Sequence, residues 1–248
     1  MSKINFAGIV DYSSVDFPGH VSAVIYLCEC PYRCPWCQNA DVALSKSETC
    51  KPKEISEIIE NLKENFIIDS VTITGGEPLM QNETYELCQK IKSETNLLLK
   101  IDHNGFYPEI LQNFLPQLDF VSVDIKAPFN EKYKISTGRN DLKNVVEKVK
   151  KTCEILSLWN KKKEARTTVV PTLIDEDEIV EIAKAINKYK FSFYTLNEFR
   201  ADRTLDEKFQ SIIPYSYEKM LNLGKLAKQH LDNIDVYVVT SKKGKEKI

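Results

Sequence analysis

VSAVIYLCECPYRCPWC, residues 21–37, is the stretch that decides how this 248-residue chain folds. Its first part, Val21–Leu27, is largely apolar and rich in β-branched residues, which predicts a buried strand. Four cysteines follow that strand within ten residues: Cys28, Cys30, Cys34 and Cys37. Such a tight group indicates metal or cluster ligation at the carboxyl end of a strand.

Strand and helix patterns alternate along the rest of the chain. Further strands are predicted at 71–74, 97–102, 119–125, 167–171, 191–196 and 234–239. Helices are predicted at 52–66, 83–94, 141–160, 176–188 and 215–231. This alternation predicts βαβ units and a mostly parallel α/β sheet, either closed into a barrel or open.

Polar and special residues follow the predicted strands. They are Gly75-Gly76-Glu77-Pro78, Asp102-His103-Asn104-Gly105, Asp124 with Lys126, and Asn197-Glu198 with Arg200. In barrels and in open parallel sheets alike, chemistry lies at the carboxyl ends of the strands. We therefore expect one functional rim.

Composition excludes several classes of protein. The net charge of -2 gives no nucleic-acid footprint, and no apolar run reaches the roughly 18 residues of a membrane span. The N-terminus lacks a signal-peptide pattern, so we expect a cytoplasmic protein without membrane or nucleic-acid partners. Disulfides are rare in a reducing compartment, and Cys50, Cys88 and Cys153 are expected to be ordinary thiols. The Lys-rich tail 241–248 is expected to fray.

Cys30, Cys34 and Cys37 form a CxxxCxxC loop. Three thiolates can hold three irons of a cubane and leave the fourth iron open to a non-protein ligand, whereas iron–sulfur clusters usually take four cysteines. A structural zinc site is an alternative, although it wants four ligands, usually in two separated pairs. Inert buried thiols are a second alternative. Whether Cys28 could also serve as a ligand stays open.

This loop resembles that of the radical S-adenosylmethionine (SAM) superfamily. The resemblance implies a [4Fe–4S] cluster on Cys30, Cys34 and Cys37 whose open iron is chelated by SAM, and reductive cleavage of SAM to a 5′-deoxyadenosyl radical. It implies that Trp36 lies near the adenine, and that Gly75, Gly76 and Glu77 match the GGE motif that contacts the SAM amino group.

Other segments resemble the glycyl-radical-enzyme activases, most closely those of anaerobic ribonucleotide reductases. Asp102 and Asn104 match their DTNG segment, and Asp124 and Lys126 match a later strand. The resemblance implies that both aspartates help to bind a monovalent cation, and that Lys126 and Arg166 face SAM. Asn197-Glu198-Phe199-Arg200 is similar to a final-strand QQFR motif, and SSVDFPG (13–19) to the opening of these proteins.

We therefore expect a single radical SAM domain over 1–248. Its fold would be a partial (β/α)6 TIM-like barrel with its core at about 20–200, an N-terminal extension, and a C-terminal helix and strand at 205–240. No auxiliary cluster is expected.

The expected function is anaerobic activation of a glycyl radical enzyme by abstraction of a glycine Cα hydrogen, with an electron donor such as flavodoxin or ferredoxin. One alternative is a radical SAM enzyme on a small molecule or modified nucleotide, as in 7-deazapurine carboxylation. The other is a non-catalytic iron–sulfur protein.

Overall fold

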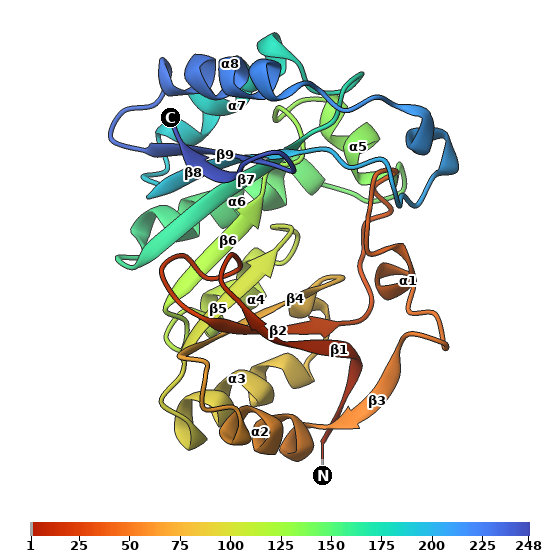
Figure 1. The fold of residues 1–248 in the computed structure, drawn as a ribbon, viewed down its shortest axis with the longest axis vertical. Helices are drawn as coiled ribbons and strands as arrows, with labels where there is room; N and C mark the ends of the chain where they lie inside the picture. Colours follow the sequence, from red (N-terminus) through yellow and green to blue (C-terminus); the bar gives the residue numbers. More distant parts are fainter. Residues whose placement is uncertain (1) are drawn as a thin grey trace. The chain divides into compact units, whose positions relative to one another are not determined.

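A computed structural model describes residues 2–248 as an α/β protein with two compact units (Figure 1). Of the described residues, unit 1 comprises 2–31, 39–103 and 109–121, and unit 2 comprises 32–38, 104–108 and 122–248. The chain therefore crosses between the units inside the cysteine loop, after the strand that carries Asp102, and within the strand that leads to Asp124.

Unit 1 is built on a sheet with the strand order β5-β4-β2-β1-β3. Its strands are β1 (Lys3–Ser13), β2 (Ser22–Leu27), β3 (Lys51–Glu54), β4 (Ser70–Gly75) and β5 (Leu98–His103). Strands β2, β4 and β5 are parallel, whereas β1 is antiparallel to β2 and to β3. The residues of β2 other than Tyr26 are buried, as its apolar sequence predicts.

The helices of unit 1 are α1 (Ala40–Ala43), α2 (Ile55–Glu64), η1 (Pro78–Met80), α3 (Glu83–Glu94) and α4 (Pro108–Phe114), whose first residue belongs to unit 2. Helix α2 buries Ile55, Ile58, Ile59 and Leu62, the spacing of one apolar helical face. It packs beside α3 (Figure 1).

The strands of unit 2 follow the order β6-β7-β8-β9-β10 in the sheet. Strand β6 (Phe120–Asp124) begins in unit 1 and ends in unit 2. The other strands are β7 (Lys162–Val169), β8 (Phe193–Glu198), β9 (Asp235–Thr240) and β10 (Gly244–Lys247). Strands β7, β8 and β9 are parallel, and β10 turns back antiparallel to β9.

The helices of unit 2 are α5 (Lys132–Thr137), α6 (Val145–Leu158), α7 (Glu176–Asn187), η2 (Glu207–Ser211) and α8 (Tyr217–Lys228). Helix α7 begins with a capping box in which Asp175 and Glu178 satisfy backbone N–H groups that the first turn leaves open. It packs beside α8 (Figure 1).

The α/β class with a mostly parallel sheet is confirmed, and several local expectations need correction. The segment before β2 forms strand β1, and 51–54 forms β3 before α2 begins. The prediction that the tail 241–248 frays is wrong, because β10 pairs with β9 and Lys245 Nζ lies 3.0 Å from buried Glu164. The prediction that Cys50 is an ordinary thiol is also wrong, because Cys50 forms a disulfide with Cys28.

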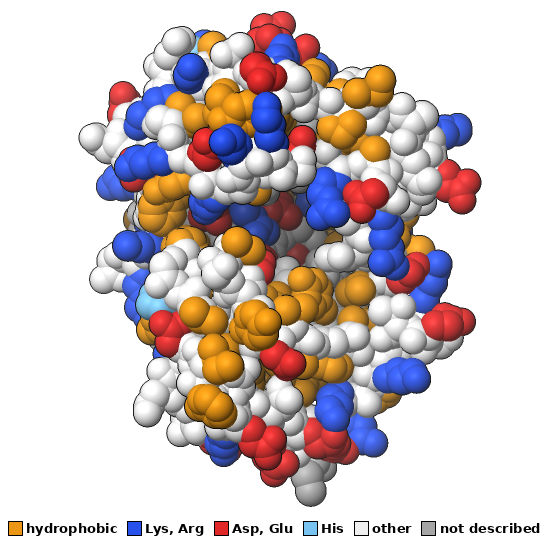
Figure 2. Space-filling model, viewed as in Figure 1, with side chains coloured by type: hydrophobic (Ala, Val, Ile, Leu, Met, Phe, Trp, Pro, Cys, Tyr) orange, Lys and Arg blue, Asp and Glu red, His pale blue; other side chains and the backbone are white. Residues whose placement is uncertain are grey.

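None of the helices in residues 2–248 is long and apolar enough to cross a membrane. On the face shown in Figure 2, acidic and basic side chains are interspersed, in keeping with the net charge of -2.

Candidate functional site

The cysteine loop supplies three thiols that are not in a disulfide. They belong to Cys30, Cys34 and Cys37, whereas Cys28 is joined to Cys50. The disulfide removes Cys28 from the set of possible ligands in this state of the protein. The loop then offers three thiols, the number that leaves one corner of a cubane without a protein ligand.

In unit 1 the residues before Cys30 are clamped against the GGE segment by backbone contacts. Gly76 N donates to Leu27 O at 2.8 Å, and Glu77 N donates to Glu29 O at 2.7 Å. A Cβ on Gly75 would lie 2.3 Å from Leu27 O, and one on Gly76 would lie 2.0 Å from Glu29 O. Close packing against the backbone of Leu27 and Glu29 therefore requires glycine at both positions. Contact of these glycines with a ligand stays a prediction.

Glu77 is fully buried directly after these glycines. Its Oε1 accepts a hydrogen bond from Leu79 N at 3.1 Å and so caps η1. One function of this carboxylate is thus to hold the turn that follows β4. Its contact with the SAM amino group remains a prediction.

Asp102 lies near the end of β5 and is paired with a buried lysine. Lys100 Nζ lies 2.6 Å from Asp102 Oδ1 and also donates to Asp16 O at 2.6 Å. Sequence reasoning missed Lys100, although a charged residue two positions before Asp102 falls on the same strand face. Since Lys100 already compensates Asp102, the carboxylate charge does not require a bound cation.

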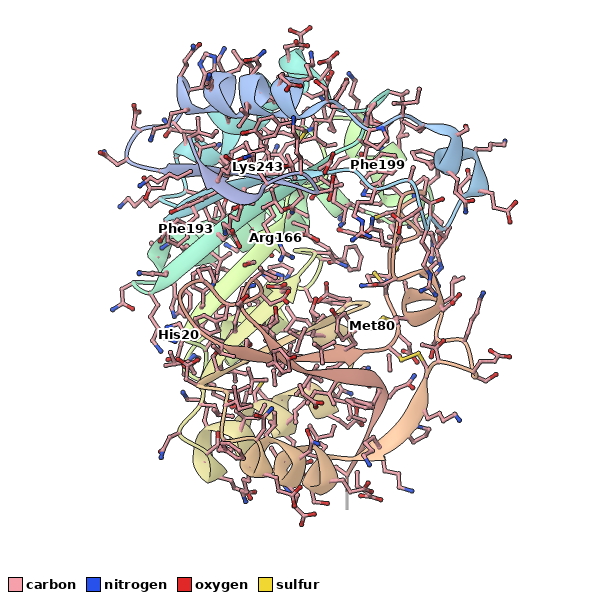
Figure 3. All side chains as sticks on the ribbon, viewed as in Figure 1. His20, Met80, Arg166, Phe193, Phe199 and Lys243 are labelled. Carbon is pink, nitrogen blue, oxygen red and sulfur yellow. A yellow bond between two sulfur atoms is a disulfide. The ribbon has the colours of Figure 1, made fainter. Side chains whose placement is uncertain are left out.

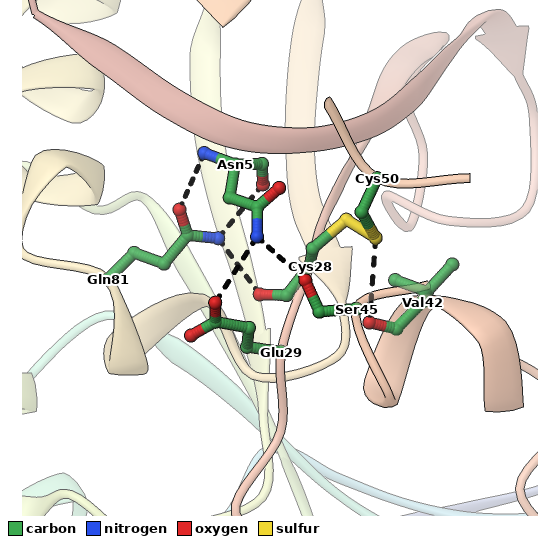
Figure 4. The surroundings of a disulfide bond; sticks show 7 residues. All are labelled: Asn5, Cys28, Glu29, Val42, Ser45, Cys50 and Gln81. Carbon is green, nitrogen blue, oxygen red and sulfur yellow. Dashed lines mark hydrogen bonds between the residues drawn. A yellow bond between two sulfur atoms is a disulfide. The ribbon is translucent and has the colours of Figure 1, made fainter. Parts of the chain in front are cut away.

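Asn5 and Gln81 form a hydrogen-bonded bracket beside Cys28, which the sequence did not predict (Figure 4). Asn5 N donates to Gln81 Oε1 at 2.8 Å, and Gln81 Nε2 donates to Asn5 O at 3.0 Å and to Cys28 O at 2.9 Å. Asn5 Nδ2 donates to Glu29 Oε1 at 3.2 Å and to Ser45 Oγ at 2.8 Å. Gln81 follows η1, so this bracket ties the segment after the GGE motif to the residues before Cys30.

In unit 2 the rest of the cysteine loop is anchored by its backbone. Arg33 N donates to Thr137 O at 2.7 Å, and Asp206 N donates to Pro35 O at 2.9 Å. Gly138, at φ 63°, is required here because a Cβ would lie 1.9 Å from Arg33 O. The buried Trp36 ring packs against Phe209, with ring centroids 6.4 Å apart.

Asp124, Lys126 and Arg166 form a charged cluster in unit 2. Arg166, which projects from β7 (Figure 3), places Nε and Nη2 3.0 and 2.9 Å from Asp124 Oδ1, and Lys126 Nζ lies 3.3 Å from Oδ2. Burial alone would raise the pKa of Asp124, but the charges of Arg166 and Lys126 outweigh it and lower the pKa to about 2. Asp124 is therefore ionised at neutral pH, and the cluster carries a net positive charge.

The pKa of the Cys34 thiol is raised to about 11, chiefly by burial. Lys126 opposes this rise, whereas Cys37 and Asp124 add to it. In the metal-free protein this thiol is protonated at neutral pH, so binding of a metal must displace the proton.

The remaining predicted residues have local structural contacts. Asn104 Oδ1 accepts a hydrogen bond from Phe106 N at 2.9 Å and closes a turn, so its amide serves the loop after β5. Glu198 Oε2 accepts from Ser241 N, and Arg200 pairs with Asp202 on the surface. Tyr133, missed in the sequence, is buried with its hydroxyl 3.3 Å from Lys126 N and from Asp124 O.

Comparison with known proteins identifies the class. The model of the radical SAM superfamily matches residues 24–160, which is more than half of the chain, and the chain belongs to this superfamily. It is 30% identical to a protein of Methanocaldococcus jannaschii assigned as a glycyl-radical enzyme activating enzyme, over 96% of this chain and 97% of that protein. It is 27% identical to the pyruvate formate-lyase-activating enzyme of Clostridium pasteurianum, over 88% of this chain and 94% of that protein.

Two solved structures share the fold. The structure of TYW1 with a lysine-pyruvate adduct has a TM-score of 0.67, at 16% identity over 90% of this chain and 77% of that one. Streptococcus suis SuiB bound to S-adenosylmethionine has a TM-score of 0.68, at 16% identity over 88% of this chain and 50% of that one. The predicted α/β fold class, that of the superfamily's partial TIM barrels, is thereby confirmed.

Membership of this superfamily implies a [4Fe–4S] cluster and SAM. The donor set fits such a cluster, because the loop holds three thiols outside any disulfide and the neighbouring Cys28 is bonded to Cys50. No three His, Cys, Asp or Glu side chains within residues 2–248 are grouped around one metal-ion position. Each cysteine of a cubane binds a different iron, so its thiols need not converge on one point.

Proposed function

We propose that Cys30, Cys34 and Cys37 hold the cluster and that the protein activates a glycyl radical enzyme. The observation that carries the proposal is the loop of three thiols outside any disulfide, in a chain 30% identical, over nearly its whole length, to an assigned activating enzyme. The anaerobic ribonucleoside-triphosphate reductase is the proposed partner, supported by the resemblance of 197–200 to the final-strand motif of that subgroup.

The bound cofactors would supply an electron to cleave SAM and an adenosyl fragment to abstract hydrogen. The residues of this chain bind and orient. The Arg166 guanidinium and the Lys126 ammonium, held in place by Asp124, form a positive surface suited to the SAM carboxylate. Gly75, Gly76 and Glu77 would present backbone groups and a carboxylate to the SAM amino group, and Trp36 an aromatic surface to the adenine.

A further part of the proposal concerns cations and electrons. Asp124 and Asp102 each have a protein cation beside them, so a monovalent cation would serve to bridge to SAM rather than to neutralise the carboxylates. The electron is proposed to come from a flavodoxin or ferredoxin, since the reaction needs a low-potential one-electron donor.

The test is electron paramagnetic resonance of the reconstituted, reduced protein with SAM and the ribonucleotide reductase of the same organism. We expect a glycyl radical doublet on the partner and one deoxyadenosine released per radical. Cys34→Ala should lose the doublet, whereas Cys153→Ala, which removes a free buried thiol of α6, should keep it.

Two results would overturn parts of this proposal. Deoxyadenosine release without a doublet on every glycyl radical enzyme of the organism would contradict the activase function and favour a small-molecule substrate. A cluster retained after replacement of Cys30, Cys34 and Cys37 together would contradict the ligand assignment.

A further inference from the structure

The disulfide of unit 1 joins the residue after β2 to the residue before β3. Cys28 comes directly before Glu29 and Cys30, and Cys50 ends the segment that begins with α1 (Figure 4). Cys28 is fully buried, whereas Cys50 is 7% exposed. Cys50 is thus the more exposed residue of the pair.

The carbonyl oxygen of Val42 connects this disulfide to the residues before Cys30. It accepts hydrogen bonds from Glu29 N at 2.9 Å and from Ser45 N at 3.1 Å, and Cys50 Sγ lies 3.8 Å away. The sulfur of a disulfide has no hydrogen to donate. After reduction, the Cys50 thiol would have this acceptor within reach and would compete with Glu29 N for it.

The backbone conformation of Glu29 depends on its hydrogen bond to the Val42 carbonyl. Its φ of 73° lies in the left-handed region, which residues other than glycine adopt at a cost. Its carbonyl accepts the Glu77 N–H, and the next residue is Cys30. Loss of the Val42 bond would thus loosen the GGE segment and the first thiol of the cysteine loop together.

We propose that Cys28 and Cys50 are a reversible redox pair whose oxidised form fixes Glu29, and with it Cys30 and the Gly76–Glu77 backbone. The inference rests on the proposed function only in naming Cys30 as a cluster ligand. The reductant is a dithiol. Its thiolate attacks Cys50 Sγ and releases Cys28 as a thiolate, its second thiol then releases Cys50, and both take up protons. Two electrons pass to the pair, and the dithiol leaves as a disulfide.

The experiment combines thiol trapping with hydrogen exchange on the cluster-loaded protein under anaerobic conditions. In buffers of graded reduced and oxidised dithiothreitol, Cys28 and Cys50 should become alkylated together, in the folded protein. On reduction, amide exchange in peptides that cover 28–31 and 75–78 should rise about tenfold, whereas α7 should be unchanged.

The matched control is the double variant Cys28→Ala/Cys50→Ala. It has no thiol to compete with Glu29 N for the Val42 carbonyl, so both segments should exchange slowly, as in the oxidised protein, and dithiothreitol should have no effect on it. Cys50→Ser should show the fast exchange of the reduced protein without reductant. If these variants fail to fold, the oxidised and reduced forms of the unmodified protein still decide the question.

Two outcomes overturn the proposal: a pair that stays in one redox state across the whole buffer range, or a reduced pair with unchanged exchange in both segments. Neither readout involves a glycyl radical enzyme. Failure of radical transfer with normal redox behaviour would therefore count against the proposed function alone.

Discussion

The predicted site residues fall into two halves, those of unit 1 and those of unit 2, and each half is built differently. In unit 1, Lys100 and Asp102 are buried, with side chains 2% and 6% exposed, and the GGE backbone is pressed against Leu27 and Glu29. In unit 2, Asp124 is 34% exposed and its partners Arg166 and Lys126 are 21% and 15% exposed. The first half is fixed by packing and by an ion pair shielded from water, and the second presents charges that solvent can reach.

This difference teaches which half tolerates change. A shielded charge that loses its partner keeps its full desolvation cost, whereas an accessible one is stabilised again by water. We therefore expect substitutions at the buried charges and close contacts of unit 1 to destabilise the fold more than substitutions at the charged cluster of unit 2.

The largest effect is expected from Lys100→Met, which leaves the Asp102 carboxylate buried without its lysine. The free energy of unfolding should fall by about 3–5 kcal/mol, as measured by urea denaturation. The double variant Lys100→Met/Asp102→Asn should recover part of the loss because it also removes the charge. A loss for Lys100→Met no greater than that for Arg166→Met would contradict the contrast between the two halves.

Gly76→Ala comes next, and it tests close packing without charge. The new methyl group would lie 2.0 Å from Glu29 O, so the backbone must shift, at a cost of about 1–3 kcal/mol or more. Gly19→Ala is the control. Its Cβ meets no atom within 4 Å but its φ is +84°, so it carries backbone strain alone, about 1–2 kcal/mol. Thermal denaturation that ranks Gly19→Ala as the more harmful of the two would show that the close contact yields easily.

Arg166→Met should have a smaller and pH-dependent effect on stability. The pKa of Asp124 is lowered to about 2 in the folded protein, below its ordinary 3.8, so its ion pairs stabilise the fold above about pH 4. That contribution is lost as the pH falls from about 4 to 2. Above pH 4 the variant should be about 1 kcal/mol less stable than the unmodified protein.

Urea denaturation at pH 6, 4, 3 and 2 measures this difference, which should shrink toward the lowest pH. The cluster-loaded Arg166→Met variant should also bind SAM more weakly than the unmodified protein does. A stability difference that does not change with pH would show that Asp124 is not the group that Arg166 stabilises.

The sequence was sufficient to predict the parts of the site that follow from local pattern. The CxxxCxxC loop follows a largely apolar strand and the GGE motif follows a short strand of β-branched residues, which makes the α/β class and the placement of these motifs predictable. The partners were not predictable, because they depend on which strands become neighbours. Lys100 meets Asp16 across 84 residues of sequence, and Gln81 meets Asn5 across 76.

The Cys28–Cys50 disulfide shows the same limit. Its sulfurs are 22 residues apart in sequence, and the assumption of a reducing compartment argued against any pair. The pairing follows from the antiparallel contacts of β1 with β2 and with β3, which place the ends of β2 and of the segment before β3 together. Since β1 carries two register irregularities against β2, its sequence gave no clean alternation by which to recognise it.

Tyr133→Phe is expected to have the smallest effect, because it removes a single hydroxyl group beside the charged cluster of unit 2. The hydroxyl accepts from Lys126 N and donates to Asp124 O, each over 3.3 Å, so the loss should be about 0.5–1.5 kcal/mol in the free energy of unfolding. Tyr194→Phe is a matched control, since that buried hydroxyl bonds Thr167 Oγ1 at 3.1 Å in the same unit. Both variants should lose similar stability, but weaker binding of SAM is expected for Tyr133→Phe alone, because Tyr133 fixes the backbone that carries Asp124 and Lys126. Equal SAM affinities in the two variants would reduce Tyr133 to a packing role and leave the salt bridges from Arg166 and Lys126 as what orients Asp124.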